Sequence, residues 1–235
     1  ITGVRDSGPT IANAPPGGPG ANLAIDTTSV MKIGPGVHFV FGDDVDIDDP
    51  SGNGTLVNDG IIEKRFGTAA GNTIQPQLNT ANGEIWVGQD QKLKLAKTPD
   101  TLSGPGGVLS GTYILDGELT LPAGTLPSQL SGQFQFGASG KITDGTFDAT
   151  TTLTNLQAGS TWTVQKDVTL TQPFTNHGTL DVQAGVTVDL VGNLDVQANG
   201  TLKGRGAGQF VYVNVFRPKN GLQASYKLSV APAAR

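Results

Sequence analysis

The fold is encoded most clearly in residues 164–202, where one short phrase recurs. It reads VQKDVTL at 164–170, VQAGVTV at 182–188 and VQANGTL at 196–202. In each copy, short apolar–polar alternations typical of half-buried strands flank a Gly, Asn or Asp that tolerates a positive φ. The copies begin 18 and 14 residues apart. Such repetition predicts a solenoid, because one coil cannot bury its apolar side alone and must stack on the next coil.

The alternation also assigns a face to each side chain near these copies. We expect the following apolar residues to point inward: Leu180, Val182, Val186, Val188, Leu190, Leu194, Val196 and Leu202. The intervening polar residues are expected to point outward: Asp181, Gln183, Thr187, Asp189, Asp195 and Gln197. Only 15% of the residues are charged, which suits a stack in which like charges on successive coils would repel.

The same strand-and-turn pattern divides the chain into three parts. Residues 1–22 form a Gly/Pro-rich arm, which is either a flexible leader or a segment that docks on a neighbouring subunit. Residues 23–206 form the all-β solenoid, with helix content near zero. Residues 207–235 contain two strand signals, FVYVNVF at 210–216 and ASYKLSV at 224–230. This hairpin either caps the stack or joins it to another subunit.

Composition excludes several classes of protein. The 235 residues carry a net charge of −5, so no strong basic face for nucleic acid is expected. No apolar run is long enough for a transmembrane helix. There is no cysteine for disulfides or thiolate metal sites. Because the chain opens on Ile1 rather than Met, we expect a processed N-terminus with a signal peptide removed.

Two phrases carry a resemblance to a known family. GTLVNDGII at 54–62 and FTNHGTLDV at 174–182 resemble the G-T-L-x-N-x-G-x-I rungs of filamentous-haemagglutinin-like adhesins and autotransporter passenger domains. The resemblance covers about residues 30–210. It implies a right-handed parallel β-helix, here of seven to nine coils, in an extracellular or cell-surface protein. The same fold also carries polysaccharide lyases and phage tailspikes, so it does not fix a function.

An acidic run at 43–49, DDVDIDD, is the only candidate metal site. On a strand, Asp44, Asp46 and Asp48 point to one side and could bind Ca²⁺, whose preferred ligands are oxygens. The EF-hand pattern fails, because Asp49 stands where that loop needs glycine. The alternative is a solvated acidic edge, and no other cofactor is expected.

Catalytic constellations are absent from the sequence. It holds two histidines, His38 and His177, and no G-x-S-x-G motif, so nucleophilic acyl transfer lacks its parts. A polygalacturonase-like order (Asp44, His177, then Arg217 and Lys219) has separations too long for one site. The two tryptophans, Trp86 and Trp162, are expected in the core rather than on a glycan-binding surface.

We therefore expect a non-enzymatic structural protein of the cell surface, a filament, surface-layer or adhesin subunit. Copies would join by strand addition into a homo-oligomer or homopolymer. The residues expected at these junctions come from both terminal segments: Ile1, Val4, Ile11, Phe210, Tyr212, Val213, Phe216, Tyr226, Leu228 and Val230. One alternative is a carbohydrate-binding or carbohydrate-cleaving β-helix with a glycan or cell-surface ligand. Another is a monomeric fragment of a larger adhesin.

Overall fold

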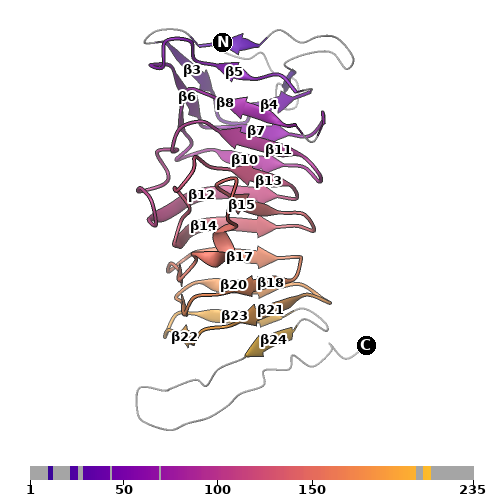
Figure 1. The fold of residues 1–235 in the computed structure, drawn as a ribbon, viewed down its shortest axis with the longest axis vertical. Helices are drawn as coiled ribbons and strands as arrows, with labels where there is room; N and C mark the ends of the chain where they lie inside the picture. Colours follow the sequence, from indigo (N-terminus) through magenta and orange to yellow (C-terminus); the bar gives the residue numbers. More distant parts are fainter. Residues whose placement is uncertain are drawn as a thin grey trace.

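The computed structural model is a parallel β-solenoid, in which short strands wind around one long axis (Figure 1). It describes residues 10–12, 22–25, 29–42, 44–68, 70–204 and 209–212. The chain visits three faces in a fixed order, so each coil contributes one strand to each face. The first face receives eight strands or half-strands within the described residues, which confirms the predicted seven to nine coils.

The strands group by face as follows. The first face holds β3 (Val30–Ile33), β6 (Thr55–Asn58), β9 (Gln77–Asn79), the first halves of β12 (Val108–Leu115) and β14 (Gln129–Phe136), β16 (Asn155–Leu156), β19 (Phe174–Asn176) and β22 (Leu194–Val196). The second face holds β1 (Thr10–Ala12), β4 (His38–Phe41), β7 (Ile61–Lys64), β10 (Glu84–Val87), the second halves of β12 and β14, β17 (Thr161–Val164), β20 (Thr179–Val182) and β23 (Thr201–Gly204). The third face holds β2 (Leu23–Ala24), β5 (Ile47–Asp48), β8 (Asn72–Ile74), β11 (Lys92–Leu95), β13 (Glu118–Thr120), β15 (Lys141–Thr143), β18 (Val168–Leu170), β21 (Thr187–Leu190) and β24 (Gln209–Tyr212).

Every pairing between these strands is parallel. Two isolated antiparallel bridges, Leu102–Leu109 and Thr143–Asp148, close loops that leave the stack. The second loop leads into η1 (Ala149–Thr151), a single 3₁₀ turn capped by the Asp148 side chain. This turn is the whole helical content of the described part of the chain, as the sequence pattern predicted.

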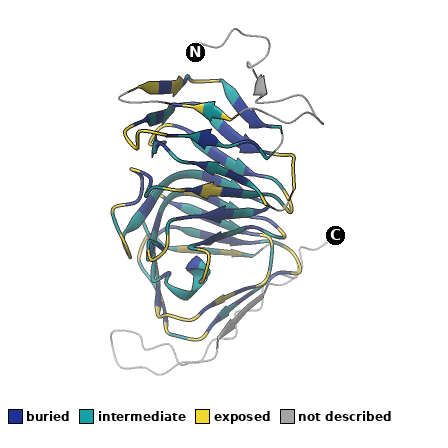
Figure 2. Ribbon diagram, turned by 45° about the horizontal axis from the view of Figure 1, so that its top comes forward, coloured by how far each residue is buried: buried dark blue, intermediate teal, exposed yellow. Residues whose placement is uncertain are grey.

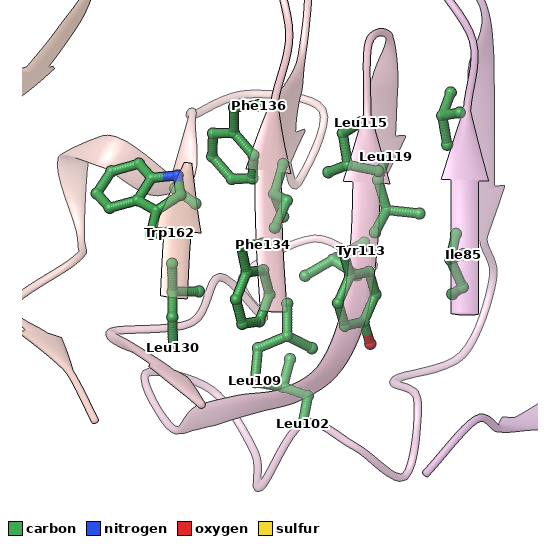
Figure 3. Close-up of a cluster of buried hydrophobic side chains, with 14 of the residues drawn as sticks. Ile85, Leu102, Leu109, Tyr113, Leu115, Leu119, Leu130, Phe134, Phe136 and Trp162 are labelled. Atoms are coloured by element: carbon green, nitrogen blue, oxygen red, sulfur yellow. The ribbon is translucent and has the colours of Figure 1, made fainter. Parts of the chain in front are cut away.

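The core is built from rows of side chains that stack along the axis. One inward row of the second face runs through Phe39, Ile62, Ile85, Tyr113, Phe134, Trp162 and Leu180 in register. All seven are at most 2% exposed. Figure 3 shows the middle of this row, where the Tyr113 and Phe134 rings stack with centroids 5.3 Å apart. Each such aromatic removes a large apolar area from water, so this row is a main source of stability.

The predicted burial near the C-terminal copies is largely confirmed. Leu180, Val182, Val186, Val188, Leu190 and Leu194 are buried, while Val196 and Leu202 are partly buried against the core. Asp181 lies on the outer row as expected, in register between Thr163 and Lys203, yet it is only 5% exposed. Figure 2 shows buried and less buried residues alternating along the strands. Alternation decides which side a residue takes, but not what covers that side.

The family-like phrases mark a particular corner between the first and second faces. In GTLVNDGII, the buried Asn58 accepts a hydrogen bond from Gly60 N–H (3.1 Å) and donates to Thr80 Oγ1 (2.9 Å). In FTNHGTLDV, the buried Asn176 accepts from Gly178 N–H in the same way (3.0 Å). A Cβ on Gly60 would collide with the backbone oxygens of Gly34 and Val37 in the preceding coil. The N-x-G motif therefore has a structural reason at both positions. The Asn side chain accepts a backbone hydrogen bond at the corner, and the glycine allows the coils to stack closely.

The third copy of the opening phrase does not continue the coil repeat. Val164 and Val182 are register partners, 18 residues apart, at the corner between the second and third faces. Val196 instead pairs with Asn176 and begins a corner between the first and second faces. The same four-residue turn serves at more than one corner, so its recurrence does not measure the coil length.

The prediction that both tryptophans lie in the core is right for one and wrong for the other. Trp162 is fully buried. Trp86 lies half-buried on the outer side of β10, because Ile85 and Val87 take the two inward positions. All three residues of Ile-Trp-Val are apolar, so their alternation does not reveal which set points inward.

The parallel stack extends into both flanking segments. β1, within the predicted N-terminal arm, pairs with β4. β24, at the start of the predicted C-terminal hairpin, pairs with β21 and so adds a further rung to the third face. The second strand expected in that hairpin, at 224–230, lies outside the described residues.

Candidate functional site

The N-terminal end of the described stack presents a strand edge. β3 pairs with β6, and no other described strand pairs with it. Ser29 O accepts Thr55 N–H (3.1 Å) and Ile33 O accepts Asp59 N–H (2.8 Å). Successive residues of a parallel strand direct their N–H and C=O groups to opposite sides. Val30 and Lys32 therefore direct theirs away from β6, and the Val30 residue is 63% exposed.

The C-terminal end presents the complementary kind of edge. Within the described residues, β22, β23 and β24 each pair with a single strand, on the first, second and third face respectively. Thr201 N–H donates to Gly178 O at 2.7 Å. Leu202, the next residue, consequently directs its N–H and C=O away from β20.

The residues predicted at subunit junctions are only partly described. Ile11 lies in β1 and Phe210 and Tyr212 lie in β24, the described strands nearest the two chain ends. The other predicted junction residues lie outside the described residues: Ile1, Val4, Val213, Phe216, Tyr226, Leu228 and Val230.

The acidic run enters β5 with the predicted alternation, since Val45 and Ile47 are buried. Asp44 Oδ1 lies 3.0 Å from the Nζ of the buried Lys64. Its carboxylate also accepts the Thr68 N–H, at 3.0 and 2.8 Å to the two oxygens. Burial raises the pKa of Asp44, but hydrogen bonds from the Thr68 hydroxyl, from Lys64 and from the Thr68 N–H outweigh it and hold the pKa below its usual value.

The other two aspartates have separate partners. Asp46 Oδ1 accepts Thr73 N–H at 2.7 Å. Asp48 accepts Asn22 Nδ2 and Gln75 Nε2, both at 2.8 Å. Protein donors thus contact all three carboxylates, and the described residues contain no group of three or more His, Asp or Glu side chains arranged to hold a metal ion. Calcium binding by Asp44, Asp46 and Asp48 stays a prediction.

The polygalacturonase-like residues do not form one site. Asp44 lies between β4 and β5, and His177 lies at the corner between β19 and β20. These corners are six coils apart along the stack, or roughly 29 Å at the usual strand spacing. Arg217 and Lys219 lie outside the described residues.

The structure brings together a cluster that sequence reasoning missed. On the outer side of the second face, His38 of β4, Glu63 and Arg65 of the β7 region, and Glu84 and Trp86 of β10 lie side by side. We call these five residues the outer cluster. Members on neighbouring strands are 19 or more residues apart in the sequence, and the register between coils brings them together. The sequence offers one indication: Trp86 follows the acidic Glu84 by two residues, so both side chains point to the same side of the strand.

Comparisons of the chain with protein-family models, with characterised proteins and with solved structures found no match. No helix in the described part of the chain is long and apolar enough to cross a membrane. The class of protein defined here is therefore the β-solenoid, and it rests on the strand pairing.

Proposed function

We propose that the protein is a non-enzymatic structural subunit of the cell surface or extracellular space, in which copies join end to end by strand addition. The observation that carries the proposal is the pair of strand edges at opposite ends of the described stack. Unpaired edge groups are templates for another strand. Because every ladder is parallel, a second copy placed above β3 would extend the first-face ladder without a change of geometry.

The symmetry of such a contact favours a filament. The N-terminal edge would meet the C-terminal edge of the next copy, which is a head-to-tail contact between unlike surfaces. Such contacts form open chains when no rotation closes them. The phrases at 54–62 and 174–182 support relating this subunit to adhesins or autotransporter passengers, as part of the same proposal.

The test blocks the edge without disturbing the ladder inside the subunit. Lys32→Pro removes an N–H that faces away from β6, so no described pairing is lost, and proline is tolerated on an edge strand in this orientation. Lys32 also pairs with Asp59 (2.7 Å), so Lys32→Thr serves as the matched control that loses this ion pair but keeps the N–H. Val30→Lys is a second blocking variant that leaves the backbone unchanged, because an exposed edge lysine disfavours strand addition.

The measurement is sedimentation and electron microscopy of the full chain over a range of concentrations. We expect the unaltered chain and Lys32→Thr to form linear assemblies. Lys32→Pro and Val30→Lys should lower the assembled fraction at least about tenfold while their circular dichroism spectra match that of the unaltered chain. A chain that stays monomeric at every concentration, or assembles equally well with both blocking changes, contradicts the proposal.

A further inference from the structure

The ladder of the third face is interrupted partway along the stack. There β2, β5, β8, β11, β13 and β15 form one ladder, β18, β21 and β24 form another, and no described pairing joins β15 to β18. The same two coils are joined on the other faces, because β14 pairs with both β16 and β17. The first face also lacks a pairing, between β9 and β12, but backbone hydrogen bonds cross it: Asp100 N–H donates to Leu78 O, and Ser110 N–H donates to Thr101 O.

The 3₁₀ turn η1 lies between β15 and β18. It contacts both strands, and its residue Ala149 is fully buried in the core. Such a turn uses its backbone groups for hydrogen bonds to its own residues, so it cannot replace a rung of the ladder. The N–H groups of Thr152 and Leu153, for example, both donate to Ala149 O at 2.9 Å. We call the junction of β15, η1 and β18 the third-face seam.

The loop that carries η1, residues 144–154, is tied more firmly to one side of the seam than to the other. Towards the preceding coil, the N–H and the hydroxyl of Thr154 both donate to Ser128 O, at 2.8 and 3.2 Å. Towards the β18 segment, the described residues show one hydrogen bond, from Thr171 Oγ1 to Thr151 O at 3.2 Å. A local opening needs little free energy where few bonds must break. The weak contact of the seam is therefore the one between η1 and β18.

A charged side chain adds to this weakness. Lys166, two residues before β18, lies close enough to Asp148 of the loop and Lys141 of β15 to interact with both charges. Burial lowers the pKa of Lys166, Asp148 raises it in part, and Lys141 lowers it further. The closed seam thus holds an ammonium group that has lost part of its hydration. Because water solvates this charge better, opening of the seam is favoured.

From this geometry we propose that the stack opens reversibly at the third-face seam while the ladders of the first and second faces stay intact. In the open form η1 parts from β18, and the two halves of the stack turn about the continuous ladders as about a hinge. The opening exposes Ala149 on one side of the seam and Val168, which is 4% exposed in the closed form, on the other. The opening takes place within one chain, so it does not depend on the proposed end-to-end assembly.

The test uses the absence of native cysteine. Ala149→Cys places one buried thiol at the seam, and Ser160→Cys places one in the same turn of the stack, at the corner between the first and second faces, where Ser160 is 2% exposed. Each full-length variant is labelled with iodoacetamide and followed by mass spectrometry, and its rate is divided by the rate in denaturant. A buried thiol reacts only when its site opens, so we expect Ala149→Cys to be labelled at least about tenfold faster. Ser160 Oγ accepts Gly132 N–H at 2.9 Å, so any weakening of the control site reduces the expected difference.

Two further changes, each combined with Ala149→Cys, act on the contact itself. Thr171→Val removes the hydrogen bond to η1 and should speed labelling about threefold, whereas Thr169→Val, at an exposed position of β18, is the matched control and should leave the rate unchanged. Lys166→Met removes the partly buried charge and should slow labelling about threefold. Circular dichroism identifies any variant that fails to fold, and Val168→Cys then replaces Ala149→Cys as the reporter.

Two results would overturn the proposal. The first is that Ala149→Cys and Ser160→Cys are labelled at equal corrected rates. The second is that labelling of Ala149→Cys rises with urea as steeply as global unfolding does, since an opening confined to the seam exposes less surface and depends less on urea. Either result would mean that the seam opens only when the whole stack unfolds.

Discussion

On strands β4, β7 and β10 the outer side of the second face carries His38, Glu63 and Trp86. On β17, β20 and β23 one of the two outer rows is a ladder of threonines, and the other consists of Thr163, Asp181 and Lys203. The threonines Thr161, Thr179 and Thr201 are register partners on neighbouring strands. The backbone ladders are the same in both regions. The inner side of each strand must fill the shared core, while the outer side is free to differ between the two halves of this face.

The inner rows of the two halves confirm this division. Ile62 and Ile85 in the N-terminal half, and Trp162 and Leu180 in the C-terminal half, are all fully buried. They differ in size but not in role, because each fills the space between neighbouring coils. Three predictions can break or sharpen the comparison.

The largest effect is expected from the two tryptophans, which lie on opposite sides of the same face. Trp162→Ala should lower the free energy of unfolding by about 4 kcal/mol, because it leaves a cavity beside Phe136 and Phe174. Trp86→Ala should lower it by less than about 1 kcal/mol, since the half-buried indole is on the outer side. Urea denaturation measures both. Equal losses from the two substitutions would mean that the outer row also holds the stack together.

The next largest loss of stability is expected at the two corners capped by asparagine, one in each half of the stack, and it should be equal at both. Asn58→Ala and Asn176→Ala should each lower the free energy of unfolding by about 2 kcal/mol, because each leaves a buried glycine N–H without its acceptor. Asn199→Ala, at an exposed turn, is the control and should cost a few tenths of a kcal/mol. A loss in only one of the two corners would show that the corners are not equivalent.

The smallest effect is a pH dependence of stability, which we expect from an ionic ladder on the third face and not from the threonine ladder on the second. On the third face, Glu118 lies in register between Lys92 and Lys141, at 2.8 and 2.9 Å from their Nζ atoms. Burial raises the pKa of Glu118, but hydrogen bonds from Lys92, Lys141 and Thr120 outweigh it and lower the pKa to about 2. This folded-state pKa is below the unfolded value of about 4.3.

The sign of the pH dependence follows from that lowered pKa. The ionised Glu118 stabilises the fold fully above about pH 4.3, and this stabilisation is lost as the pH falls toward about 2. Glu118→Gln should therefore remove about 1 kcal/mol of the acid-dependent loss, after allowance for solvent screening of a partly exposed group. The measurement is the free energy of unfolding of the variant and of the unaltered chain, compared between pH 5 and 2. Thr161→Val, on the uncharged ladder, should leave the pH profile unchanged.

Individual residues show which side-chain positions the apolar–polar alternation predicted and which it did not. The alternation around 180–194 predicted the inward side chains correctly, because those apolar residues have polar neighbours. It failed at Trp86, where three apolar residues are consecutive, and it did not predict that Asp181, on the outer side as expected, is buried. The acidic run was visible as a cluster, but its partners Lys64, Thr73 and Gln75 were not, because they belong to the next coil.

The amino-acid sequence by itself determined that the chain forms short strands and turns that must stack, because alternation and turn residues act over a few positions. Only the tertiary structure decided which side chains meet between coils. The spacing of coils varies, from 19 residues between the starts of β16 (155) and β19 (174) to 31 between those of β9 (77) and β12 (108). The strands β4, β7 and β10 are 23 residues apart, but the chain as a whole keeps no such period, so the sequence did not reveal that His38, Glu63 and Trp86 lie together. That alignment comes from the hydrogen-bonded register of the folded stack, which joins residues distant in the chain.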